Sequence, residues 1–99
     1  MDYWKLLGDG WEVTEHQHYT YITKGCEIHF EATGNPRGLR WMFEEAFGPV
    51  IEEHGFATTR VPHGFDDRFT RRIGFEETWR DERFVYFIMM QVPFSRKGK

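Results

Sequence analysis

Cysteine is almost absent from this sequence, and Cys26 is its only occurrence. A single cysteine cannot form a disulfide within the chain, so nothing here demands an oxidising compartment, and we expect a cytoplasmic protein. The sequence places no general base beside Cys26, so Cys26 is more typical of a small packed side chain than of a nucleophile. Serine is equally scarce, because Ser95 stands alone, and this argues against a serine hydrolase.

Long hydrophobic runs and an excess of basic charge are missing as well. Residues 1–10 carry Asp2 and Asp9 without a long apolar core, so we expect neither a signal peptide nor a membrane span. A net charge of −3 and 29% charged residues argue against disorder and against a general nucleic-acid coat. Acidic residues outnumber basic ones by ten to four in residues 1–57, and basic residues outnumber acidic ones by nine to six in residues 58–99. The basic half either meets an anionic ligand or is an ordinary solvated face.

Aromatic residues are plentiful by contrast, at 18% of the 99 residues, with ten Phe and four Trp. Each large ring buries roughly 150–250 Å², so the chain has enough apolar surface for one core. We therefore expect a single domain that spans residues 1–99.

Alternating and β-branched segments predict strands at residues 11–19, 19–23 and 26–33, with a turn at Lys24–Gly25. A helix follows, because apolar residues from Leu39 to Ile51 recur at the i, i+3, i+4, i+7 spacing. Pro49 removes a backbone donor, so this helix should kink or change register near Gly48, and Gly55 should cap its end.

Residues 56–61 predict a strand parallel to the preceding one, which completes a βαβ unit. A short helix near residues 65–73, capped by Gly74, and a hairpin of residues 75–79 and 84–92 complete the chain. The predicted fold class is α/β in the α+β sense: a mixed, mostly antiparallel sheet with a central helix and a short second helix.

Four segments together resemble the GNAT superfamily of N-acetyltransferases, and short phage-encoded members in particular. They are EIHFEA, GNPRGLRWMFEEAF, ATTRV and RFTRRIGFEETWRDERFVYFIM, in that order. The resemblance implies a GNAT-like fold that lacks the family's two N-terminal helices. It also implies an N-acetyltransferase activity, acetyl-CoA as the cofactor and an amine as the acceptor.

The turn that opens the central helix is the candidate pyrophosphate site, since backbone N–H groups and the positive helix end meet there. An ordinary helix start is the alternative. The cofactor-binding candidates are Phe30, Asn35, Arg37, Gly38, Leu39, Arg40 and His63. Glu31 and His29 share one face of the strand at residues 26–33 and are the candidate general bases. The alternative is that this face is polar only because it is half-exposed to solvent.

Two positions depart from the family pattern. Thr70 occupies the place of the Tyr that protonates the departing thiolate in the family, and His63 occupies the place of a common Asn. The chain is therefore either an acetyltransferase or a catalytically silent relative that binds a host protein, for example as an anti-CRISPR-type inhibitor, or joins a virion assembly. Because the helices that form the acceptor site in the family have no counterpart here, a partner subunit could supply that surface, and a homodimer is a further alternative. His16 and His18 lack a third metal ligand, so no metal site is predicted.

Overall fold

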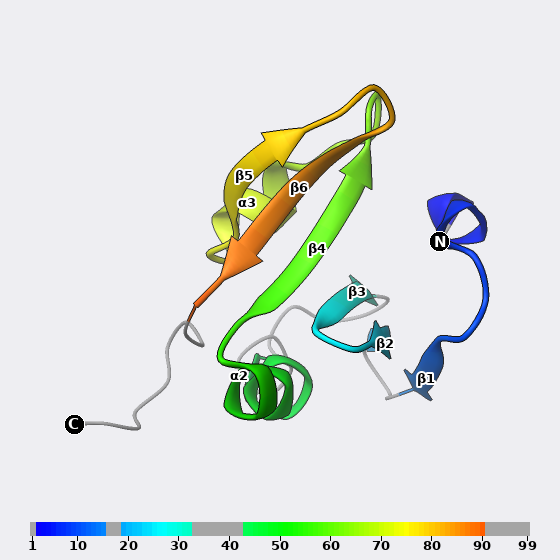
Figure 1. The fold of residues 1–99 in the computed structure, drawn as a ribbon. Coiled ribbons are helices and arrows are strands. Elements are labelled where there is room, and N and C mark those ends of the chain that lie inside the picture. The colour runs from blue at the N-terminus through cyan, green and yellow to red at the C-terminus, as the bar shows by residue number, and fades with distance from the viewer. Residues whose placement is uncertain (1, 16–18, 33–42, 91–99) are drawn as a thin grey trace.

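The computed structural model describes residues 2–15, 19–32 and 43–90, and this part of the chain forms one six-stranded sheet with four short helical segments. The strand order across the sheet is β1-β2-β3-β4-β6-β5 (Figure 1). The strands are β1 (Glu12–Glu15), β2 (Tyr19–Lys24), β3 (Glu27–Ala32), β4 (Ala57–Pro62), β5 (Glu76–Arg80) and β6 (Phe84–Met89). The helical segments are η1 (Asp2–Leu7), η3 (Phe43–Phe47), α2 (Gly48–His54) and α3 (Arg68–Arg72).

The first three strands form the predicted antiparallel meander. The turn between β2 and β3 contains Gly25 at φ 62°, a left-handed conformation that glycine adopts without a steric penalty. β1 is shorter than predicted and covers only residues 12–15. Residues 16–18 of the predicted strand lie outside the described part.

The central helix changes type where Pro49 predicts a change of register. The turn before it, η3, is a π-helix, and α2 is an α-helix that carries Pro49 in its first turn. Proline lacks the backbone donor and crowds the preceding turn, and a wider turn accommodates both effects. Gly55 ends the helix at φ 88°, and its N–H donates to the Ile51 carbonyl at 2.7 Å. Residues 33–42, where the helix is predicted to begin, lie outside the described part.

β3 and β4 are parallel, as predicted, but they pair only at the start of each strand. Their one register pair is Glu27 with Thr58, and the Thr58 N–H donates to the Cys26 carbonyl at 2.8 Å. All other neighbouring strands of the sheet pair over four or more positions. β3 and β4 therefore separate toward their C-terminal ends, and the sheet divides into two halves there (Figure 1).

The C-terminal half contains the predicted short helix and hairpin, with β6 between β4 and β5. Two cores cover the two faces of the sheet. The larger lies on the side of η3, α2 and α3 and includes Phe47, Ile28 and Phe87, all at most 1% exposed. On the opposite face η1, which the sequence pattern does not predict, brings Leu7 against Ile22 and Phe84. No helix in the described part is long and apolar enough for a membrane span.

Candidate functional site

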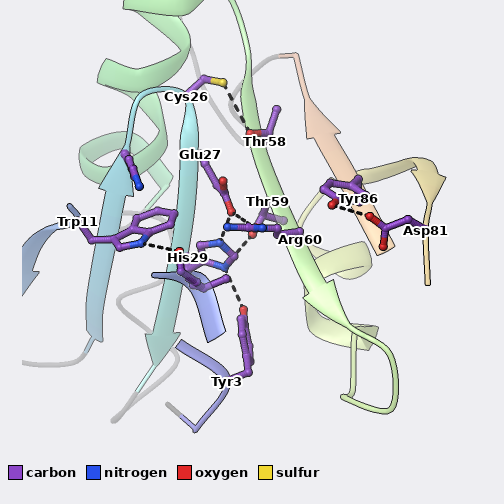
Figure 2. A network of polar contacts seen from close by, with 12 residues as sticks. Tyr3, Trp11, Cys26, Glu27, His29, Thr58, Thr59, Arg60, Asp81 and Tyr86 are labelled. Atoms are coloured by element: carbon purple, nitrogen blue, oxygen red, sulfur yellow. Dashed lines mark hydrogen bonds and ion pairs between the residues drawn. The ribbon is translucent and has the colours of Figure 1, made fainter. Parts of the chain in front are cut away.

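A buried histidine on β3 is the centre of a polar network where the two halves of the sheet separate. His29 is 1% exposed. Its Nε2 lies 2.7 Å from Glu27 Oε2, and its Nδ1 lies 3.1 Å from the Tyr3 hydroxyl and 3.3 Å from Thr59 Oγ1. These partners come from β3, η1 and β4, so the imidazole links three elements (Figure 2).

The partners of His29 determine where its proton lies. A carboxylate only accepts, so Nε2–H donates to Glu27, and Nδ1 accepts from the hydroxyls of Tyr3 and Thr59. Burial lowers the pKa of His29, and Arg60 acts in the same direction, against the opposing effect of Glu27. The imidazole is therefore neutral at pH 7, with all its polar atoms bonded.

Glu27 joins the histidine to an arginine on the neighbouring strand β4. Arg60 Nε donates to Glu27 Oε2 at 2.7 Å, and both side chains are 23% exposed. Burial alone would raise the pKa of the Glu27 carboxyl, but the hydrogen bonds from His29 and Arg60 outweigh it and keep that pKa below its usual value. Glu27 is thus an ionised carboxylate that accepts two hydrogen bonds through one oxygen.

Tyr3 closes the network from the N-terminal side. Its ring packs edge-on against His29 at 5.6 Å and against Phe65 at 5.5 Å, measured between ring centroids. Burial raises the pKa of its hydroxyl to about 12, and the Glu27 charge contributes to this rise. Tyr3 therefore stays protonated at pH 7 and donates to the neutral His29.

The remaining predicted residues of the described part lie in three different surroundings. Glu31 is half-buried and follows His29 on the same face of β3. Phe30 points to the opposite face, where its ring packs edge-on against Phe47 and Phe69, each at 5.4 Å. His63 is exposed in the turn after β4, and its Nε2–H donates to the Asp81 carbonyl at 2.7 Å. The structure thus brings His29 and Glu31 together on one strand face and places His63 against the β5–β6 turn.

The predicted pyrophosphate turn lies outside the described residues. This concerns Asn35, Arg37, Gly38, Leu39 and Arg40, and it concerns His16 and His18 as well. Within residues 2–15, 19–32 and 43–90, no group of three or more His, Cys, Asp or Glu side chains is suited to a metal ion.

Four members of the network are absent from the sequence-based candidates: Tyr3, Glu27, Thr59 and Arg60. Tyr3 belongs to a segment with no periodic pattern, so no signal points to it. The sequence gives only a weak indication for Arg60. It lies on a predicted strand that should run beside the strand of Glu27, and opposite charges on neighbouring strands favour pairing.

The network resembles a carboxylate–imidazole–hydroxyl relay in its order of groups, but the hydroxyls are enclosed. Thr59 is 6% exposed, and the hydroxyl of Tyr3 on η1 is directed at the buried His29, so neither hydroxyl is available to a substrate in this arrangement. Beyond the network, β3 and β4 have no further register pair. Their facing backbone edges at residues 30–32 and 61–62 therefore do not pair with each other, and we call this separation of the strands the opening, although the side chains of Val61 and Pro62 are buried.

Comparisons with protein-family models, with curated proteins and with solved structures each give no match. The resemblance to the GNAT superfamily stays a prediction from the sequence motifs.

Proposed function

We propose that this chain binds acyl-CoA in the opening between β3 and β4 and acts as a small N-acetyltransferase. The observation that carries the proposal is the single register pair between two parallel neighbouring strands. Backbone N–H and C=O groups along the separated edges need partners, and an extended ligand that contains amides can supply them. The pantetheine arm of CoA is such a ligand, since it is a narrow chain with two amide groups.

The motif resemblance supports the same placement. The segment after β3 carries Arg37 and Arg40 and is the predicted start of a helix, where a pyrophosphate would meet backbone N–H groups and positive charge. The strand order, with β6 between β4 and β5, is compatible with this arrangement. In the proposed complex the arm enters between the strands and the phosphates lie at the C-terminal end of β3.

The proposed reaction is direct transfer without a covalent enzyme intermediate. The amine nitrogen attacks the thioester carbon, the carbon–sulfur bond breaks, and CoA leaves as the thiolate. Glu31 is the candidate acceptor of the amine proton, because it lies near the end of β3 that does not pair with β4. His29 then positions β3 against β4 and η1, and positioning is the main contribution to a direct transfer.

Calorimetric titration with acetyl-CoA tests the cofactor proposal. The wild type should bind, and Arg37→Glu should weaken binding by about tenfold through the loss of a favourable charge beside the phosphates. Arg72→Glu is the matched control, because Arg72 is an exposed arginine on α3 without an ion pair to any described residue, and it should bind like the wild type. Absence of binding by the folded wild type would contradict the proposal.

A catalytically silent binding module is the second candidate, and the closed network favours it. The hydroxyls of Tyr3 and Thr59 both contact the single lone pair of His29 Nδ1, and Thr70 replaces the expected tyrosine acid. Such a module would bind a host protein through the same scaffold. Release of free thiol from acetyl-CoA, measured with a chromogenic disulfide and a mixture of primary amines, separates the two. Binding without thiol release supports the silent module, and release that Glu31→Gln abolishes supports the transferase.

A further inference from the structure

A shallow cleft lies on the sheet face opposite α2 and α3 and is separate from the opening between residues 30–32 and 61–62. Its volume is about 400 Å³. β4, β5 and β6 form most of it, and β3 contributes one carboxylate. The cleft is lined by Glu27, Thr58, Thr59, Arg60, Thr78, Trp79, Tyr86, Phe87 and Ile88.

An exposed indole forms one wall of this cleft. Trp79 on β5 is 58% exposed, although it is among the largest apolar side chains of the chain. Its ring stacks on Tyr86 with centroids 4.9 Å apart and planes at 5°. Tyr86 is itself held, because its hydroxyl donates to Asp81 Oδ2 at 2.9 Å. The stacked pair therefore presents a flat, preorganised aromatic surface, and stacking holds the indole in place rather than burial in a core.

A charged pair forms the polar part of the cleft. Glu27 and Arg60 neutralise each other through the 2.7 Å contact between Oε2 and Nε. The hydrogen bonds to Glu27 from described residues both reach Oε2, so Oε1 has an unused acceptor site there. The described residues provide no second carboxylate for Arg60, whose guanidinium lies 4.7 Å from the centroid of Phe84. An acceptor oxygen thus lies beside N–H donors, and the pair has no net charge (Figure 2).

We propose that this cleft binds a nucleobase, with the flat ring against Trp79 and one edge against Glu27 and Arg60. The edge of every nucleobase carries an N–H donor next to an acceptor atom, which matches Oε1 and the guanidinium. Base–aromatic stacking supplies the remaining affinity.

Two other ligand classes fit the cleft less well. A sugar presents several hydroxyls that need partners, yet the Thr78 hydroxyl already donates to the Tyr86 carbonyl and Thr58 Oγ1 contacts Cys26 Sγ at 3.6 Å. A simple amine gains little, because Arg60 offsets the charge of Glu27. The assignment does not depend on the acetyltransferase proposal, since it uses Glu27, Arg60 and Trp79 rather than the strand edges at residues 30–32 and 61–62.

Titration of the ¹⁵N-labelled chain with adenosine and guanosine, followed through the indole N–H signals, tests this proposal. The Trp79 signal, identified by its loss in Trp79→Phe, should move on addition of either nucleoside. Trp79→Ala should weaken binding by about tenfold, which is within the range for loss of one base stack. Val13→Ala is the matched control, because Val13 on β1 is an exposed apolar residue outside the cleft, and it should bind like the wild type.

Further probes identify the source of the base and the limits of the proposal. Equal affinity for adenosine and adenosine monophosphate indicates that the natural ligand is a free nucleoside. Tighter binding of a short single-stranded oligonucleotide indicates that the ligand is a base within a nucleic-acid strand. Both results support the proposed site. Methyl glucoside should cause no chemical-shift change of the Trp79 indole N–H signal. Pantetheine, which lacks the base of CoA, should also cause no change of this signal. The proposal is overturned if no nucleoside moves the signal, if Trp79→Ala binds like the wild type, or if the glucoside or pantetheine moves the signal equally.

Discussion

Replacement of Glu27 by alanine should remove the carboxylate that joins the two halves of the sheet. Glu27 Oε2 accepts hydrogen bonds from His29 Nε2 and Arg60 Nε, each at 2.7 Å. A hydrogen bond to a charged group contributes about 1.5–3 kcal/mol, and solvent screening favours the lower value because the carboxylate is 23% exposed. Loss of both bonds therefore predicts a decrease of about 3 kcal/mol in the free energy of unfolding.

A decrease of this size is a large share of the stability of a small domain, which is about 5–15 kcal/mol in total. For a domain of 60–100 residues each kcal/mol lowers Tm by about 4–8 °C, so Glu27→Ala should lower Tm by roughly 12–24 °C. Urea denaturation at pH 7.5, followed by circular dichroism, measures the free energy directly.

Glu76→Ala is the matched control for Glu27→Ala. Glu76 is an exposed glutamate on β5 without an ion pair among the described residues, and its replacement should change stability by less than about 0.5 kcal/mol. If Glu27→Ala were as stable as Glu76→Ala, the network would not hold the sheet together and the reasoning about the network would be wrong.

Three further predictions concern the same fold. The free energy of unfolding should decrease as the pH falls below about 6.5, because burial lowers the pKa of His29 in the folded chain and the unfolded chain therefore binds the proton more readily. Urea midpoints measured between pH 8 and pH 5 should show this decrease, and His29→Gln should make the midpoints less dependent on pH. Tyr3→Phe keeps the ring but removes the donor to His29, so it should cost about 1 kcal/mol and remove one tyrosine that ionises near pH 12 in an absorbance titration; an unchanged titration would contradict the placement of Tyr3. Phe47→Ala should cost about 3–5 kcal/mol in the same urea assay, because Phe47 is 0% exposed, whereas the 60% exposed Leu6 should tolerate alanine; equal effects would contradict the assigned core.

Local patterns predicted most elements of the sheet. The two-residue alternation at residues 26–33, the glycine at the β2–β3 turn and the Pro49–Gly55 pair each determine backbone geometry within a few residues, and the structure contains β3, the turn and α2 where these patterns indicate. The polar alternation also placed Glu27, His29 and Glu31 on one face of a strand.

The partners of that polar face could not be predicted. His29 is buried because Tyr3 folds over it from a segment 26 residues earlier and Thr59 approaches from 30 residues later. Such contacts depend on the tertiary arrangement, and no local spacing encodes them. The separation of β3 and β4 is equally invisible in the sequence, because both segments have ordinary strand patterns and only their mutual register shows it.

The central claim is that an acyl-CoA arm lies between β3 and β4, and amide chemical shifts of the ¹⁵N-labelled chain on addition of acetyl-CoA test it most directly. We expect the largest shifts at the amides of Phe30 and Glu31 on β3 and of Val61 on β4, with smaller shifts at β1 on the far edge of the sheet. Saturating acetyl-CoA that leaves these three amides unmoved would contradict it.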